Sequence, residues 1–138
     1  MRIMIDTNLF ISAMLFPSSK LAQDIFDAAD RFSLVISSQI LEEFRAVVKR
    51  KFPDKMKEAE TLLRRLKYEI AYTPVNIDPD LFPKIRDPKD YPILASAILA
   101  NVDVFISGDT DFCEVVVEWP EISSPSDFAM KYLQDSMR

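Results

Sequence analysis

The 138-residue chain contains no histidine, one glycine and one cysteine, and each scarcity excludes a class of function. Without histidine there is no Ser-His-Asp or Cys-His nucleophile system, no histidine general base and none of the usual catalytic zinc sites. The single glycine, Gly108, cannot form the glycine-rich loops of dinucleotide-binding or P-loop proteins. An enzyme of this composition would depend on carboxylates, Lys, Arg, Ser, Thr or Tyr, and a hard cation held by carboxylate oxygens suits that set best.

The lone cysteine, Cys113, has no partner for an internal disulfide, which favours a reducing compartment. Without a histidine to activate it, we expect it to be a small buried hydrophobic residue. The longest largely apolar run, residues 93–100, is far shorter than the roughly 20 residues of a membrane span. Asp6 interrupts the N-terminal apolar run, which is not the pattern of a signal peptide. We therefore expect a cytoplasmic protein without membrane association.

The length suits one domain, and we expect residues 1–138 to form it. With 49% hydrophobic and 28% charged residues, the chain has enough apolar side chains for a core and reads as a globular protein. The net charge of −5 argues against nucleic-acid binding through global positive charge, although an acidic metal site is itself negative until filled. Two groups of basic residues form either a local basic rim or an ordinary solvated helix face: residues 49–51, and Arg64, Arg65 and Lys67.

The hydrophobic periodicity alternates between strand and helix along the chain. The pattern predicts strands at Arg2–Ile5, Phe32–Ile36, Ile70–Thr73 and Asp103–Ser107. It predicts helices at Asn8–Leu15 and Ser18–Ala29, from a Ser37/Ser38 cap to Lys51, from an Asp54 cap onward, at Tyr91–Ala100 (apolar nearly all round and so buried), and from Ser124 onward. Such alternation implies parallel pairing, and we expect an α/β fold, a three-layer α/β/α sandwich around a mainly parallel sheet.

Four acidic residues are expected at one edge of this sheet, where parallel strands end and where ligands bind in such folds. Asp6 and Asp109 follow predicted strands, and Glu43 and Asp90 lie in the first half of predicted helices. At 100° per residue, Glu43 flanks the apolar stripe of its helix, whereas Glu42 points further toward solvent. Converging carboxylates that face inward require a cation or raised pKa values.

Each acid also has an ordinary structural interpretation. Asp6 could simply cap a helix, and Glu43 could be a solvated helix residue. Asp90 could be a first-turn acid that interacts favourably with the helix dipole, and Asp109 and Asp111 could be turn residues. The metal-site interpretation therefore depends on the convergence of the acids rather than on any one of them.

Four short motifs in order resemble those of the PIN-domain family over about residues 1–125. They are Ile5-Asp6-Thr7-Asn8, then Ser37 with Glu43-Phe44 and Val47-Val48, then Asp87-Pro88-Lys89-Asp90 with Ala95 and Ala97, and finally Ser107-Gly108-Asp109-Thr110-Asp111-Phe112. The first and last motifs most resemble the VapC-like toxin branch of toxin–antitoxin systems. The resemblance implies a PIN-like fold and a Mg²⁺- or Mn²⁺-dependent endoribonuclease that hydrolyses RNA phosphodiester bonds. The implied products carry 5′-phosphate and 3′-hydroxyl ends.

The resemblance also implies the residues of the site. The implied acidic cluster is Asp6, Glu43, Asp90 and Asp109, with Asp111 as a possible fifth metal ligand; which of Asp109 and Asp111 lies closer to the metal stays open. Thr7, Asn8 and Ser107 match polar positions that would orient carboxylates or water. Arg86 and Lys89, beside Asp90, either contact substrate phosphate or are solvated surface residues.

The family resemblance implies a homodimer and a small antitoxin protein as partner. Two other functions stay open. One is a non-catalytic PIN-like scaffold that binds RNA or protein. The other is a phosphatase with an aspartyl nucleophile at Asp6, which is less favoured because such enzymes usually carry a second acid where this chain has Asn8.

Overall fold

The computed structural model of the chain describes residues 1–72, 91–108 and 120–133, and for residues 91–94 the backbone alone. The elements are β1 (Arg2–Ile5), α1 (Thr7–Leu15), α2 (Lys20–Arg31), β2 (Ser33–Ser37), α3 (Ser38–Lys51), the 3₁₀ turn η1 (Pro53–Lys55), α4 (Met56–Arg65), β3 (Glu69–Ala71), α5 (Tyr91–Leu99), β4 (Val104–Ile106), β5 (Glu121–Ser123), α7 (Pro125–Phe128) and the π-helical turn η4 (Ala129–Leu133).

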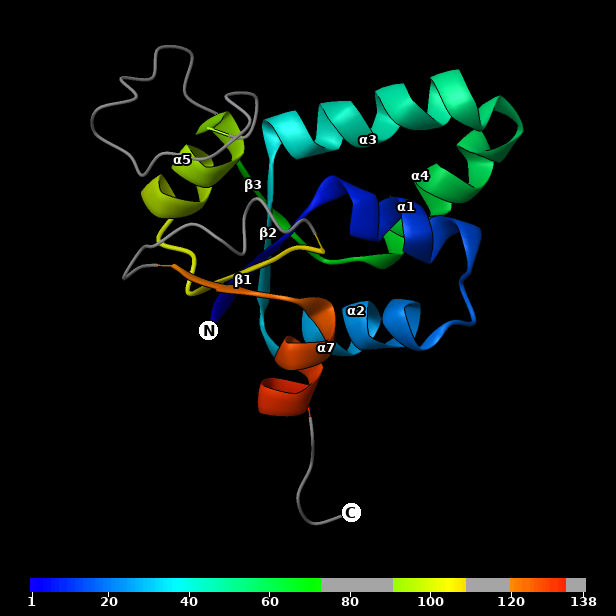
Figure 1. Cartoon of the computed structure of the whole chain (residues 1–138). Helices are drawn as coiled ribbons and strands as arrows, with labels where there is room; N and C mark the ends of the chain where they lie inside the picture. The colour runs from blue at the N-terminus through cyan, green and yellow to red at the C-terminus, as the bar shows by residue number, and fades with distance from the viewer. Residues whose placement is uncertain (73–90, 109–119, 134–138) are drawn as a thin grey trace.

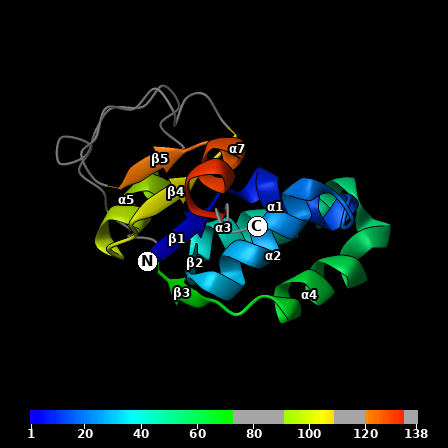
Figure 2. The ribbon, with the colours of Figure 1, turned by 90° about the horizontal axis from the view of Figure 1, so that it is seen from below.

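The strands form one parallel sheet in the order β3-β2-β1-β4-β5 (Figures 1 and 2). The central strands β2, β1 and β4 are buried almost throughout, as near-continuous apolar runs in a parallel sheet should be. Helix α5 lies on one side of the sheet, and α1, α2 and α4 lie on the other (Figure 2). The predicted α/β fold with a mainly parallel central sheet is therefore confirmed.

The core joins the sheet to the helices through large buried side chains. Phe10 of α1 and Phe44 of α3 are both 1% exposed, and their rings meet edge to face with centroids 6.2 Å apart. This contact fixes α1 against α3, the two helices that begin directly after β1 and β2. The packing therefore determines how the first turns of these helices lie relative to one another.

Most element boundaries agree with the periodicity, and the caps explain why. β1 has the predicted bounds, and Ser37 caps α3 by accepting a hydrogen bond from the Ile40 amide at 3.0 Å. Ser124 likewise caps α7 through the Asp127 amide.

Three predictions need correction. Asp54 does not cap α4, because it lies inside η1 and Lys55 occupies the cap position without a side-chain hydrogen bond. Strand β5 was not predicted, because three residues carry too little periodicity. Helix α5 is not buried all round: Ala95–Ala97 are buried, whereas Leu99 is 63% exposed.

Within the described ranges, no helix is long and apolar enough to cross a membrane.

Candidate active site

The carboxyl ends of β1 and β4 lie side by side and place Asp6 next to Ser107. Ile5 pairs with Ile106 in the parallel register, and the Asp6 amide donates to the Ile106 carbonyl at 3.0 Å. The Ser107 hydroxyl donates to Asp6 Oδ2 at 3.0 Å. Both residues are buried: Asp6 is 8% exposed and Ser107 is fully buried. The sheet edge therefore holds a buried carboxylate in a defined orientation.

Asp6 is also the N-cap of α1. Its Oδ1 accepts a hydrogen bond from the Thr7 amide at 2.8 Å, and its backbone is extended, as a cap position requires. The capping interpretation is therefore correct, and it does not compete with a functional one. Capping uses Oδ1, while the Ser107 hydroxyl binds Oδ2, so both oxygens of the carboxylate are oriented by the fold.

Thr7 connects Asp6 to Glu43. Thr7 is buried and makes two hydrogen bonds. Its amide donates to Asp6, and its hydroxyl donates to Glu43 Oε2 at 3.1 Å. A continuous chain of hydrogen bonds thus runs from Ser107 through Asp6 and Thr7 to Glu43. The sheet edge and the second turn of α3 are tied together by this chain, and two carboxylates from distant parts of the sequence are brought to one place.

Glu43 faces inward as its position on α3 predicts. Its side chain is half-buried, whereas the neighbouring Glu42 is exposed. Gln39, one turn earlier, donates from Nε2 to Glu43 Oε1 at 3.3 Å. Sequence reasoning missed Gln39, although its i, i+4 spacing from Glu43 placed the two side chains on one helix face. Glu43 therefore has a donor on each oxygen, as Asp6 does.

The remaining predicted site residues fall into two groups. Asn8 is exposed in the first turn of α1, next to Thr7. Asp90, Asp109, Asp111, Arg86 and Lys89 lie outside the described residues. Of the five predicted metal ligands, the structure thus describes Asp6 and Glu43, and the described part of the chain holds no group of three or more acidic or cysteine side chains able to bind a metal ion.

The chemistry of the described donors fits a hard divalent cation. All candidate ligand atoms are carboxylate oxygens, which Mg²⁺ and Mn²⁺ prefer over the nitrogen and sulfur ligands of zinc. The described hydrogen-bond donors to these carboxylates include two hydroxyls, a backbone amide and a side-chain amide. Neutral donors orient a carboxylate without cancelling its charge, so its attraction for a cation remains.

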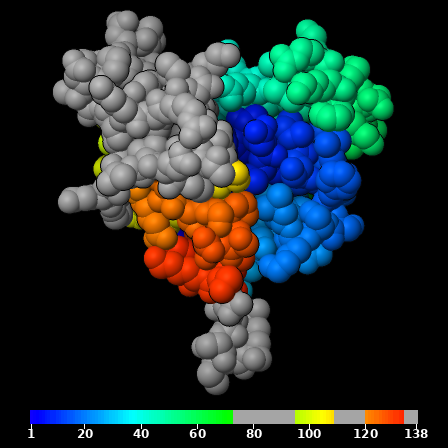
Figure 3. Space-filling view, in the orientation of Figure 1, coloured from blue at the N-terminus to red at the C-terminus, as the bar shows by residue number. Residues whose placement is uncertain are grey.

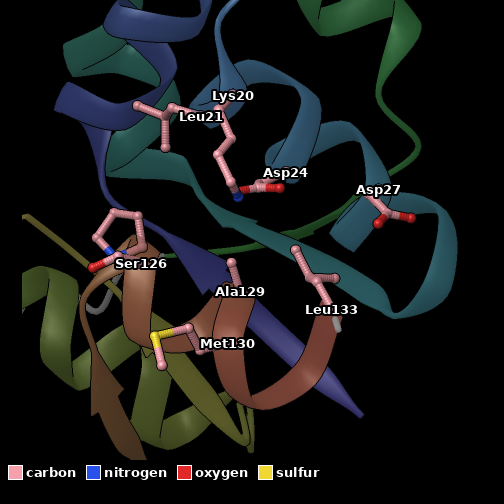
Figure 4. Close-up of a pocket in the computed structure, with 9 residues that line it drawn as sticks. Lys20, Leu21, Asp24, Asp27, Ser126, Ala129, Met130 and Leu133 are labelled. Carbon is pink, nitrogen blue, oxygen red and sulfur yellow. The ribbon is translucent and has the colours of Figure 1, made fainter. Parts of the chain in front are cut away.

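A separate groove of about 530 Å³ lies between α2 and the C-terminal helical turns, and it is not the candidate site (Figure 4). Leu21, Ala129, Met130 and Leu133 contribute apolar lining. Its two carboxylates, Asp24 and Asp27, both come from α2 and are paired with Lys20 and Arg31 of the same helix. These i, i+4 pairs are ordinary helix-surface interactions, and none of the predicted site residues lines the groove.

A comparison with models of known protein families identifies the family of the chain. The family model described as "PIN domain" matches residues 2–111, which include the two described carboxylates and Ser107. The chain belongs to the PIN-domain family. This match confirms the predicted resemblance to PIN domains. A separate search of curated proteins found no match to the sequence.

The fold is similar to that of a chain in a crystal structure of VapBC2 from Rickettsia felis bound to a DNA fragment from its promoter. The TM-score is 0.68 at 18% identity, and the match covers 90% of this PIN-domain chain and 98% of the other chain. At this identity the likeness concerns the fold, and it agrees with the predicted PIN-like architecture.

Proposed function

We propose that this PIN-domain protein is a metal-dependent endoribonuclease that hydrolyses RNA phosphodiester bonds. The observation that carries the proposal is the hydrogen-bonded chain Ser107–Asp6–Thr7–Glu43, which orients two carboxylates at the carboxyl edge of a parallel sheet. This is the edge at which α/β folds bind ligands. Family membership supports the same conclusion.

Asp6, Glu43, Asp90 and Asp109 are the residues proposed to hold Mg²⁺ or Mn²⁺, with Asp111 as a possible fifth ligand. Such a cation would supply Lewis acidity, which would make a bound water molecule a stronger nucleophile and stabilise negative charge on the phosphate.

The other residues act by orientation. The Thr7 hydroxyl binds one oxygen of Glu43, and the Ser107 hydroxyl binds one oxygen of Asp6. These hydrogen bonds are proposed to keep both carboxylates in a fixed orientation during the reaction. Gln39 does the same for the second oxygen of Glu43. Asn8, which is exposed beside them, is proposed to orient substrate or water. Arg86 and Lys89 are proposed to contact substrate phosphate.

We further propose that the chain is the toxin of a toxin–antitoxin pair, acts as a homodimer in the cytoplasm and is bound by a small antitoxin protein. The support is the similarity in fold to a chain of the VapBC2 structure from Rickettsia felis. Co-expression with the protein encoded by a neighbouring gene, followed by co-purification, tests the partner independently of catalysis.

The nuclease proposal is tested with labelled single-stranded and structured RNAs in Mn²⁺, Mg²⁺ or EDTA, with Asp6→Asn as the inactive variant. Asparagine keeps the Oδ1 acceptor that caps α1, so the fold should persist. We expect the substitution to reduce cleavage at least about 100-fold, because it removes a ligand charge rather than a supporting hydrogen bond. Asp30→Asn, an exposed acid of α2, is the matched control and should retain full activity.

Cleavage by pure, folded Asp6→Asn protein at the wild-type rate would contradict the site assignment. RNA binding without cleavage in any metal would favour the scaffold alternative. A phosphorylated Asp6 trapped during turnover of a phosphate ester would favour the phosphatase.

A further inference from the structure

Positive charge in this acidic protein is concentrated in one segment. Residues 45–67 contain nine of the 17 lysine and arginine residues but three of the 22 acidic residues, so their net charge is +6. Because the whole chain carries −5, the remainder carries −11. The segment consists of the second half of α3, the turn η1, α4 and the residues directly after it. The two helices therefore form a cationic hairpin on an otherwise anionic molecule.

Most of these cations are exposed and are not engaged in ion pairs with the described residues. Arg45 is an exception, because it pairs with Glu60 and joins α3 to α4. Arg65 stacks on the Phe26 ring at 3.7 Å. We define the α3–α4 basic surface as the other exposed cations of the segment: Lys49, Arg50, Lys51, Lys55, Lys57, Arg64 and Lys67. These seven side chains remain available to an external polyanion.

The α3–α4 basic surface begins about two helical turns from Glu43 of the candidate active site. Helix α3 starts at the carboxyl end of β2, which pairs with β1, and extends away from the sheet toward α4 (Figure 1). Arg50 follows Glu43 by two helical turns, so it lies about 10 Å further along and within about 20° of the same helix face. In the space-filling view, the hairpin (cyan to green) adjoins α1 (dark blue) at the surface (Figure 3). An extended ligand bound at Glu43 would thus pass next to Arg50.

We infer that the α3–α4 basic surface binds the phosphate backbone of the RNA strand beyond the bond that is cleaved. The inference rests on the proposed nuclease function. RNA fits better than an acidic protein because the surface begins one or two nucleotides' length from the site where a phosphodiester must lie. Arg50 supplies a forked donor for phosphate, and Lys49 and Lys51 flank it in sequence. The enzyme therefore selects RNA long enough to reach the hairpin.

The binding test uses the Asp6→Asn protein, so that RNA is not consumed. A triple variant, Lys49→Gln with Arg50→Gln and Lys51→Gln, is compared with a control of equal charge change, Lys20→Gln with Arg31→Gln and Lys131→Gln. The control positions are paired with acids on α2 and β5, away from the hairpin. Thermal unfolding first establishes that both variants fold, as substitutions at such exposed positions should permit.

The readout is fluorescence anisotropy of a labelled single-stranded RNA of about 20 nucleotides at several salt concentrations. We expect the hairpin variant to raise Kd at least about tenfold and to reduce the slope of log Kd against log salt by about two, which is three phosphate contacts on a single strand. The control should change Kd by the small amount due to net charge. Equal losses in the two variants would overturn the inference, as would equally tight binding of polyglutamate of similar charge, which would assign the surface to an acidic protein.

Cleavage by the wild-type active site supplies the second readout. With the hairpin variant, kcat/KM for the long RNA should fall about tenfold, mainly through KM, while a trinucleotide should be cleaved as by the wild type. An equal fall for both substrates would mean a structural defect and would overturn the inference. If the protein proves not to cleave RNA, the anisotropy result still decides whether the hairpin binds RNA, so the two proposals fail separately.

Discussion

Asp6 accepts a hydrogen bond from the Thr7 amide on one carboxylate oxygen and from the Ser107 hydroxyl on the other. A helix cap and a metal-ligand position are often treated as alternatives, yet here the cap fixes the carboxylate in an orientation that the proposed metal ligand would need. The Thr7 residue extends the arrangement, because its amide contacts Asp6 and its hydroxyl contacts Glu43. Thr7 thus connects two carboxylates. We expect removal of its hydroxyl group to affect metal binding more than folding.

We predict that Thr7→Val weakens Mn²⁺ binding and RNA cleavage about 10- to 100-fold, the usual effect of losing a hydrogen bond that orients a ligand. Valine keeps the β-branched shape at a buried position, so the free energy of unfolding should fall by only about 1 kcal/mol. Isothermal titration with Mn²⁺ measures the affinity. Thr61→Val is the matched control, because that exposed hydroxyl donates to the Lys57 carbonyl on α4. Unchanged Mn²⁺ affinity in Thr7→Val would show that Thr7 does not position Glu43.

At the scale of elements, sequence periodicity predicted what depends on local pattern and missed what depends on tertiary pairing. β1 and the Ser37 cap of α3 were predictable because an apolar run and a hydroxyl before a helix are local signals. β5 has three residues and is a strand only because it pairs with β4. Asp54 looked like a cap, but Pro53 starts a 3₁₀ turn that includes it.

The candidate site shows the same division. The facing of Glu43 followed from helical spacing, and the adjacency of Asp6 and Ser107 followed from parallel strand ends. The bond from Thr7 to Glu43 was not predictable, because it depends on how α1 packs against α3 around Phe10 and Phe44. The spacing of residues in the sequence predicts at which edge of the sheet a residue lies. The packing of helices determines which other residues it contacts.

The edge strand β5 is tied to the C-terminal turn by a pH-dependent contact. The Tyr132 hydroxyl donates to Glu121 Oε1 at 2.5 Å, and Lys131 contacts the same carboxylate. The Tyr132 hydrogen bond is the main reason that the pKa of Glu121 lies below its ordinary value of 4.5. A carboxylate with a lowered pKa stabilises the fold above its unfolded pKa, and this contribution is lost as pH falls through the folded pKa.

We therefore predict that Tyr132→Phe is less stable than wild type at pH 7 and that the difference shrinks toward pH 3. Phenylalanine keeps the ring that packs against Phe128 and Phe32, so the hydroxyl alone is tested. The difference should also shrink above about pH 10, because Glu121 raises the pKa of Tyr132 and the wild type loses that contribution on deprotonation. Urea unfolding of both proteins at pH 3, 7 and 10.5 measures it. A difference that stays constant with pH would contradict the assigned role.

For the whole molecule, the two edges of the sheet have different electrostatic arrangements. At the edge where strands begin, Arg2 pairs with Glu69 through two hydrogen bonds, and its backbone amide binds Asp103. At this edge the charge of Glu69 is compensated by Arg2 within the protein. At the edge where strands end, Asp6 and Glu43 are oriented by neutral donors. We propose that a bound cation compensates the negative charge of Asp6 and Glu43 at that edge.

This asymmetry predicts a metal-dependent stability. A divalent cation that binds only the folded protein stabilises it by about 1.4 kcal/mol at ten times its Kd, which should raise Tm by roughly 5 °C for a chain of this size. Differential scanning fluorimetry with Mn²⁺ and with EDTA measures the shift. Glu43→Gln should abolish the rise, and in EDTA it should be at least as stable as wild type, because it removes one of the converging negative charges. Glu42→Gln, the exposed neighbour on the same helix, should keep the full rise. An equal Mn²⁺ effect in both variants would place the cation elsewhere on this acidic surface.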